Sequence, residues 1–138
     1  FYLKDNYNSL INIELFNQNE LYQLIDLFKD RASSLEDIIS NISKLGLIKK
    51  DFNAEEKVIL KNFEKYKKTL VDKLSDIIEW NEQNIEIIIK DVIEYHKTNF
   101  KSIAQPLRLL ITGSLFGPSI YKIIMILGNK KIIQRINR

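Results

Sequence analysis

The stretch SIAQPLRLLITGSLFGPSIYKIIMILGNKKIIQRINR, from Ser102 to Arg138, decides the fold of this chain. Its apolar residues recur at helical spacing, and glycine and proline interrupt them at intervals typical of short helices. Glycine ends helices in the left-handed conformation, and proline suits a first helical turn because it donates no backbone N–H. The residues that divide the stretch into three short helical pieces are Pro106, Gly113, Gly117, Pro118 and Gly128.

These residues predict where each piece begins and ends. We expect Pro106 in the first turn of the first helix and Gly113 at its C-terminus. Pro118 should open the second helix and Gly128 should end it. Asn129 can then cap the third helix with its side-chain oxygen.

Upstream, amphipathic spacing predicts four longer helices, and no strand pattern competes with them. Their expected ranges are roughly 20–32, 35–45, 54–74 and 82–100, with Gly46 just past the end of the second. Ser34, Asn53 and Asn81 stand where the second, third and fourth helices need N-caps. The sequence therefore predicts an all-α fold.

Charge changes at residue 100. Residues 101–138 hold seven basic side chains and no Asp or Glu. Residues 1–100 hold the other 14 basic groups and all 18 acidic ones, a net charge of −4. We therefore predict two regions, 1–100 and 101–138, with a polyanion as partner of the second. The alternative is that the basic region is an ordinary solvated surface.

Several kinds of chemistry lack the residues that they need. The chain has no cysteine and one histidine, His96, so it holds neither a thiolate nucleophile nor a His/Cys zinc set. Its four glycines form no phosphate-binding loop, and no apolar run is long enough to span a membrane. We expect a cytoplasmic protein with no metal and no membrane contact. Because the first residue is Phe1 rather than Met, we also expect the chain to be part of a longer protein.

The order of motifs in residues 102–138 resembles the end of bacterial glutamyl-tRNA synthetases. That family ends in an Ala-Gln-Pro-Leu-Arg helix start, Thr-Gly, a proline turn, an apolar helix closed by Leu-Gly, and a basic last helix. The matching segments here are Ala104 to Arg108, Thr112 with Gly113, Gly117 with Pro118, Leu127 with Gly128, and Lys130 to Arg138. The likeness upstream is looser but collinear, with aromatic Phe1 and Tyr2 and with Trp80 before a polar helix start.

This resemblance implies an α-helical cage of two small subdomains that grips the anticodon stem and loop of tRNA-Glu. Some members of the family also charge tRNA-Gln. A separate Rossmann-type domain with HIGH and KMSKS-type motifs would use ATP and Mg²⁺ to attach glutamate, and neither motif occurs in these 138 residues. We therefore expect the intact protein to be a class I glutamate–tRNA ligase and a monomer, and the fragment alone to be inactive.

The resemblance also implies which residues contact the RNA. Arg108 lies where the family places a guanidinium against an anticodon base, and its rigid fork of donors suits that role. Gly117, Pro118 and Ile120 match a turn that offers backbone groups and an apolar contact to the other bases, although many members have Thr where Gly117 stands. The expected phosphate contacts are Lys122, Lys130, Lys131 and Arg135.

Two alternatives stay open at this point. The Ile-rich helices could instead form a protein-interaction module with a basic surface, whose binding would depend less on salt than phosphate binding does. A free-standing enzyme is discouraged by the missing metal, nucleophile and phosphate-loop motifs.

Overall fold

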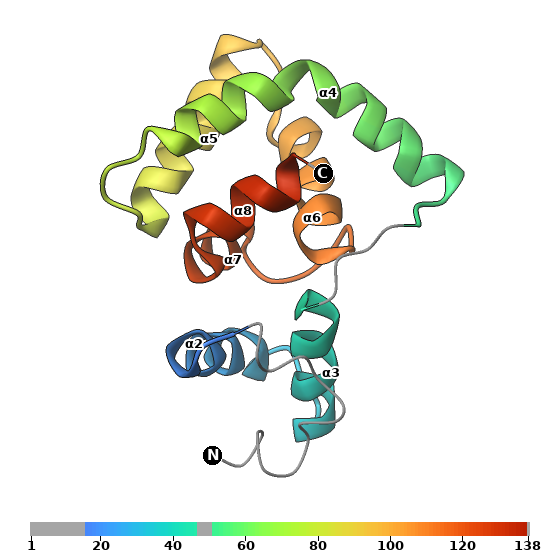
Figure 1. Cartoon of the computed structure of the whole chain (residues 1–138). Coiled ribbons are helices and arrows are strands. Elements are labelled where there is room, and N and C mark those ends of the chain that lie inside the picture. Colours follow the sequence, from blue (N-terminus) through green and yellow to red (C-terminus); the bar gives the residue numbers. More distant parts are fainter. Residues whose placement is uncertain (1–15, 47–50, 138) are drawn as a thin grey trace. The chain divides into compact units, whose positions relative to one another are not determined.

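A computed structural model describes residues 16–46 and 51–137. All the regular structure in these residues is helical, which confirms the predicted all-α fold (Figure 1). The chain forms two compact units, residues 1–48 and 49–138. The predicted division at residue 100 marks the change in charge and falls inside the second unit. Phe1, Tyr2 and Arg138 lie outside the described residues.

The described part of the first unit contains two helices, α2 (Gln18–Lys29) and α3 (Leu35–Gly46), which pack against each other through buried aliphatic and aromatic side chains. Asn17 begins α2 with a capping box: its side chain accepts from Glu20 N at 2.8 Å, and Glu20 Oε1 accepts from Asn17 N at 3.2 Å. Ser34 Oγ accepts from Asp37 N at 3.2 Å, which confirms the predicted cap of α3.

The second unit contains five described helices. They are α4 (Ala54–Ser75), α5 (Glu82–Tyr95), α6 (Phe100–Thr112), α7 (Ile120–Leu127) and α8 (Asn129–Ile136). The central helix is α6, which packs against α4, α5, α7 and α8. Seven of its 13 residues are buried, so the quoted stretch supplies the core as well as the basic charge.

The predicted starts of α4 and α5 and the predicted end of α6 are correct. Asn53 and Asn81 cap α4 and α5, and Gly113 ends α6 in the left-handed conformation with φ 77°. Pro106 is a correction: α6 begins at Phe100, six residues earlier, because Asn99 Oδ1 accepts from Ser102 N at 2.9 Å and caps it there. Pro106 therefore lies inside the helix with its ring buried, and the carbonyl of Ser102 loses its usual helical partner.

Several further boundaries differ from prediction. Helix α2 runs from Gln18 to Lys29 rather than from about 20 to 32, α3 includes Gly46, and α7 begins at Ile120, after Pro118 rather than with it. The helix α5 ends at Tyr95 rather than near Phe100, and Lys97 follows with a left-handed φ of 53°. Asn129 is the first residue of α8 rather than its cap, because Gly128 with φ 86° both ends α7, as predicted, and begins α8. No side-chain hydrogen bond caps α8 at this position.

Replacement of Asn53 by alanine should lower the free energy of unfolding by about 1 kcal/mol, the usual loss for a side-chain N-cap. Asn53 Oδ1 accepts from Glu56 N at 2.8 Å, and Glu56 Oε1 accepts from Asn53 N at 3.0 Å, so both orphan donors depend on this pair. Urea denaturation followed by circular dichroism measures the change. Lys61→Ala, at an exposed position of the same helix, should have an effect below about 0.5 kcal/mol. Equal stabilities of the two variants would contradict the assignment of the cap.

Candidate nucleic-acid interface

The turn between α6 and α7, residues 113–119, brings together three of the predicted site residues. Arg108 reaches from α6 across the turn, and its Nη1 donates to Pro118 O at 2.8 Å. Gly117 lies beside this bond: a Cβ placed on Gly117 would be 3.5 Å from Arg108 Nη1. The structure thus brings Arg108, Gly117 and Pro118 together, and their contacts with RNA stay a prediction.

Side chains also fix the first half of the turn. Thr112 Oγ1 donates to Arg108 O at 2.8 Å and accepts from Ser114 N at 3.2 Å. Ser114 Oγ accepts from Phe116 N at 3.3 Å. The turn is therefore held at both ends by hydrogen bonds and needs little further ordering before it meets a ligand.

Glycine at position 117 is explained by the backbone rather than by space. Its φ is 157°, a conformation that residues with a side chain rarely adopt, whereas a Cβ would make only an ordinary contact with Arg108. Gly117 can therefore offer a ligand its backbone groups but no hydroxyl.

Ile120 does not occupy the place that the resemblance predicts. Its side chain is 1% exposed and belongs to the core, so an RNA base cannot stack on it or contact it directly. The physical reason is the shortness of α7: an eight-residue helix is held in place by burying Ile120 together with four other apolar residues. Pro118 is buried as well, and its carbonyl accepts the hydrogen bond from Arg108.

Arg135 is also a correction. The side chain is 6% exposed, and its Nη1 donates to Ile111 O at 2.6 Å. Ile111 lies in the last turn of α6, where carbonyl groups lack helical partners and the helix dipole favours a cation. Arg135 therefore joins α8 to the end of α6 in the interior and does not present its charge to phosphate.

The predicted lysines are in different environments. Lys122 and Lys130 are exposed, whereas Lys131 is half-buried and takes part in an interaction of its own. Lys101 adds another exposed cation at the start of α6. Since residues 100–137 contain no acidic side chain, these charges are not offset within α6, α7 or α8.

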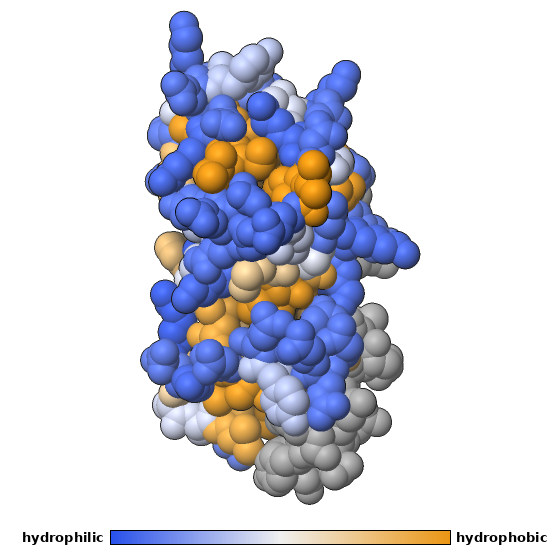
Figure 2. All heavy atoms as spheres, turned by 90° about the vertical axis from the view of Figure 1, so that its left-hand side faces the viewer, coloured by the Kyte–Doolittle hydropathy of each residue, from blue (hydrophilic) through white to orange (hydrophobic). Residues whose placement is uncertain are grey.

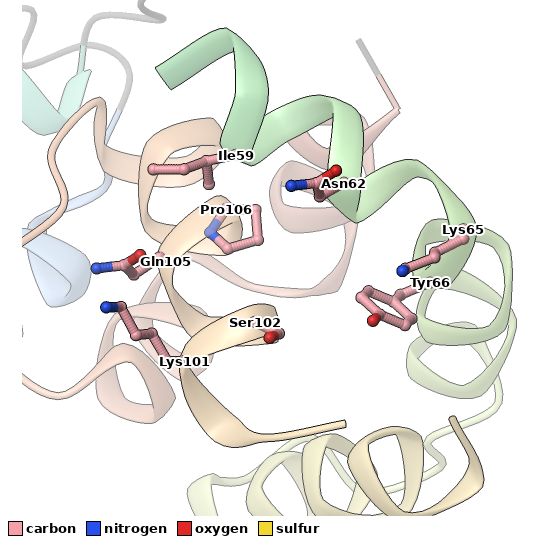
Figure 3. A pocket seen from close by; sticks show the side chains of 8 residues that line it. All are labelled: Ile59, Asn62, Lys65, Tyr66, Lys101, Ser102, Gln105 and Pro106. Atoms are coloured by element: carbon pink, nitrogen blue, oxygen red, sulfur yellow. The ribbon is translucent and has the colours of Figure 1, made fainter. Parts of the chain in front are cut away.

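A pocket of about 380 Å³ lies between α4 and α6 and was not predicted (Figure 3). Lys65 and Asn62 of α4 face Lys101, Ser102 and Gln105 of α6 around it, and no Asp or Glu lines it. Lys65 Nζ lies 5.1 Å from the centre of the Tyr66 ring. The hydrogen bond between the Tyr66 hydroxyl and Thr98 lowers the pKa of Tyr66 from its ordinary value, and its contacts with Lys65 lower that pKa further. The sequence signals at this pocket are Lys101, in the acid-free region, and Lys65, in a lysine-rich stretch of α4.

Sequence reasoning also missed Phe116. This side chain is 80% exposed, the highest fraction for an aromatic residue in the described part of the chain, and it stands next to Gly117 in the turn. Its place beside a Gly-Pro turn did not show whether its ring is buried or exposed.

Other kinds of site find no support in the described residues. Within 16–46 and 51–137, no group of three His, Cys, Asp or Glu residues could hold a metal ion. None of the described helices is long and apolar enough to cross a membrane. His96 has a structural setting, with Nε2 3.1 Å from Thr69 Oγ1 and its ring edge-on to Tyr66 and Tyr95.

A family model described as "Anticodon binding domain" matches residues 3–138. This chain belongs to the anticodon-binding domain family. The site just described is therefore the α6–α7 turn of an anticodon-binding domain, and the predicted family is confirmed.

Curated relatives of the domain are longer proteins. The chain is 39% identical over 111 residues to a glutamate–tRNA ligase of Pelagibacter ubique, covering 78% of this chain and 23% of that protein. It is 36% identical over 137 residues to glutamate–tRNA ligase 1 of Campylobacter hominis, covering 97% of this chain and 29% of the relative. The anticodon-binding domain thus spans less than a third of these proteins.

A solved structure shares the fold of the domain. The crystal structure of a glutamate tRNA ligase from Elizabethkingia meningosepticum matches 99% of this chain and 29% of its own with a TM-score of 0.78. Sequence identity is 22%, so this likeness concerns the fold, and it confirms the predicted architecture.

Proposed function

We propose that this domain recognises the anticodon stem and loop of tRNA-Glu as part of a class I glutamate–tRNA ligase. The observation that carries the proposal is the braced turn, in which the Arg108 guanidinium and the Pro118 carbonyl hold each other at 2.8 Å in an anticodon-binding domain. A guanidinium offers five N–H donors in a fixed plane, so the bond to Pro118 also orients the fork for a base edge. RNA sequence is read mainly at such unstacked loop bases.

Catalysis is proposed to lie in another part of the same protein. That part would use ATP and Mg²⁺ to activate glutamate, and the intact ligase would act as a cytoplasmic monomer. The names of the relatives support this proposal, since each is a glutamate–tRNA ligase several times the length of this chain. Charging of tRNA-Gln as well is a further property that aminoacylation of both purified tRNAs would decide.

Salt dependence tests RNA binding against the alternative of a protein-docking module. Three lysines are exposed, Lys101, Lys122 and Lys130, so we expect binding to release counterions from about three phosphates. A plot of the logarithm of the binding constant against the logarithm of salt concentration should then have a slope of about −2 or steeper. Fluorescence anisotropy with labelled tRNA-Glu and the full-length protein measures this slope. Lys122→Gln and Lys130→Gln should each make it shallower by about 1.

A flat salt profile would instead favour docking of a protein partner. Docking surfaces are usually continuous apolar patches. On the face shown in Figure 2, apolar patches alternate with hydrophilic side chains. This pattern gives the docking module less support than the braced turn gives RNA recognition.

A further inference from the structure

We propose that Phe116 is a stacking platform for one unpaired base of the RNA loop, an inference that rests on the proposed function. Phe116 lies in the α6–α7 turn, one residue before Gly117, and its side chain is 80% exposed. Neither the family resemblance nor the lysine pattern assigns it a role. The chemical class that it would bind is the flat face of a nucleobase.

Phe116 differs from the other exposed aromatic residues of the second unit. Tyr95 is 70% exposed and Phe100 is 46% exposed, and each contacts another ring. The ring centres of Tyr95 and His96 are 4.9 Å apart, and those of Phe100 and Tyr121 are 5.9 Å apart. Their exposed parts belong to small aromatic clusters within the fold. Phe116 stands further into solvent, where a phenyl ring gains stability by being covered.

The α6–α7 turn holds Phe116 in place. Phe116 N donates to Ser114 Oγ at 3.3 Å, and two residues later Arg108 Nη1 donates to Pro118 O at 2.8 Å. A ring on an anchored backbone loses little conformational entropy when a ligand covers it, since phenylalanine has two side-chain torsions. The position is therefore suited to binding rather than only to connecting helices.

The charge around Phe116 selects a nucleic acid over a protein as the occupant. The Arg108 guanidinium lies beside the next residue of the turn, and residues 100–137 contain no acid that would repel phosphate. Single-stranded nucleic acids bind where aromatic faces stand within positively charged surface. A base stacked on Phe116 would have its edge near Arg108, so one residue would hold the face and the other would read the edge.

The test combines three Phe116 variants with tRNA-Glu transcripts that lack one base at each anticodon position in turn. Phe116→Ala in the full-length protein should weaken binding of tRNA-Glu about five- to tenfold, the low end of base–aromatic stacking. Phe116→Trp should restore binding because it keeps a π face, and Phe116→Leu should not. All three should melt within a few degrees of the wild type because the side chain is exposed.

The abasic transcripts identify the base and separate the two hypotheses. At one anticodon position, removal of the base should cost the wild type the same five- to tenfold and leave Phe116→Ala unaffected. Three results would overturn the inference and leave the proposed function standing. They are equal losses of affinity in both proteins at every abasic position, full restoration of binding by Phe116→Leu, and undiminished binding by Phe116→Ala. If the wild type does not prefer tRNA-Glu to an unrelated tRNA, the proposed function and the inference both fail.

Discussion

Replacement of Arg135 by alanine should lower the free energy of unfolding by about 3 kcal/mol. The substitution removes a charged hydrogen bond, leaves the Ile111 carbonyl without that donor in the interior, and empties the space of a long side chain. Urea denaturation of the chain, followed by circular dichroism, measures the change.

Lys130→Ala is the matched control for Arg135→Ala. It removes the same charge from the same helix at an exposed position, so its effect on stability should be below about 0.5 kcal/mol. If Arg135 were a surface contact for phosphate, Arg135→Ala would be as stable as the control and would make the salt dependence of RNA binding shallower. That result would show that the interior position is incorrect.

Replacement of Arg108 by alanine should weaken binding of tRNA-Glu by about 1 to 3 kcal/mol, the magnitude expected of an arginine that reads a base. The variant loses the guanidinium and also the 2.8 Å bond that fixes the Pro118 carbonyl. Arg108→Lys should bind tRNA-Glu little better than Arg108→Ala does, because an ammonium group cannot hold the Pro118 carbonyl and meet a base edge in one plane. Anisotropy titrations with the full-length protein measure these affinities.

Lys122→Ala provides the comparison for Arg108→Ala. It removes one exposed cation near the start of α7 and should weaken binding of tRNA-Glu and of an unrelated tRNA to the same extent. Arg108→Ala should weaken binding of tRNA-Glu more than binding of the unrelated tRNA. Undiminished affinity for tRNA-Glu in Arg108→Ala would remove Arg108 from the site.

Helix content and most caps could be predicted from the sequence because they are local properties. Asn53 and Gly113 stand within a few residues of the backbone groups that they satisfy, so spacing alone locates them. Pro106 was misplaced because proline tolerates a helix interior when surrounding packing supports it, and Asn99 was the stronger start signal.

Burial of charged and apolar site residues depends on tertiary packing and was harder to predict. The buried face of α8 contains Ile132, Arg135 and Ile136, at positions i, i+3 and i+4. That periodicity placed Arg135 on the apolar face, and it would have predicted an interior arginine had spacing been weighed above charge. Burial of Ile120 was missed for a similar reason. Helix α7 has only eight residues, so it needs all five of its buried apolar side chains, Ile120 included, to be held in the core.

The α6–α7 turn shows what sequence and structure each contribute. Resemblance identified Arg108, Gly117 and Pro118, and the structure supplied the bond between Arg108 and Pro118 that orients them. Exposure of Phe116 could not be predicted, because an aromatic residue in a turn is buried or exposed according to how the turn folds back on its helices.

The most direct measurement of the central claim is the affinity of the full-length protein for tRNA-Glu and for the same tRNA with its three anticodon bases replaced. Both RNAs have the same body and phosphate charge, so a difference in affinity reports recognition of the anticodon alone. Recognition through the braced turn predicts that the replacement weakens binding about tenfold or more in the wild type and much less in Arg108→Ala. Equal affinity of the wild type for both RNAs would contradict the claim that this domain reads the anticodon.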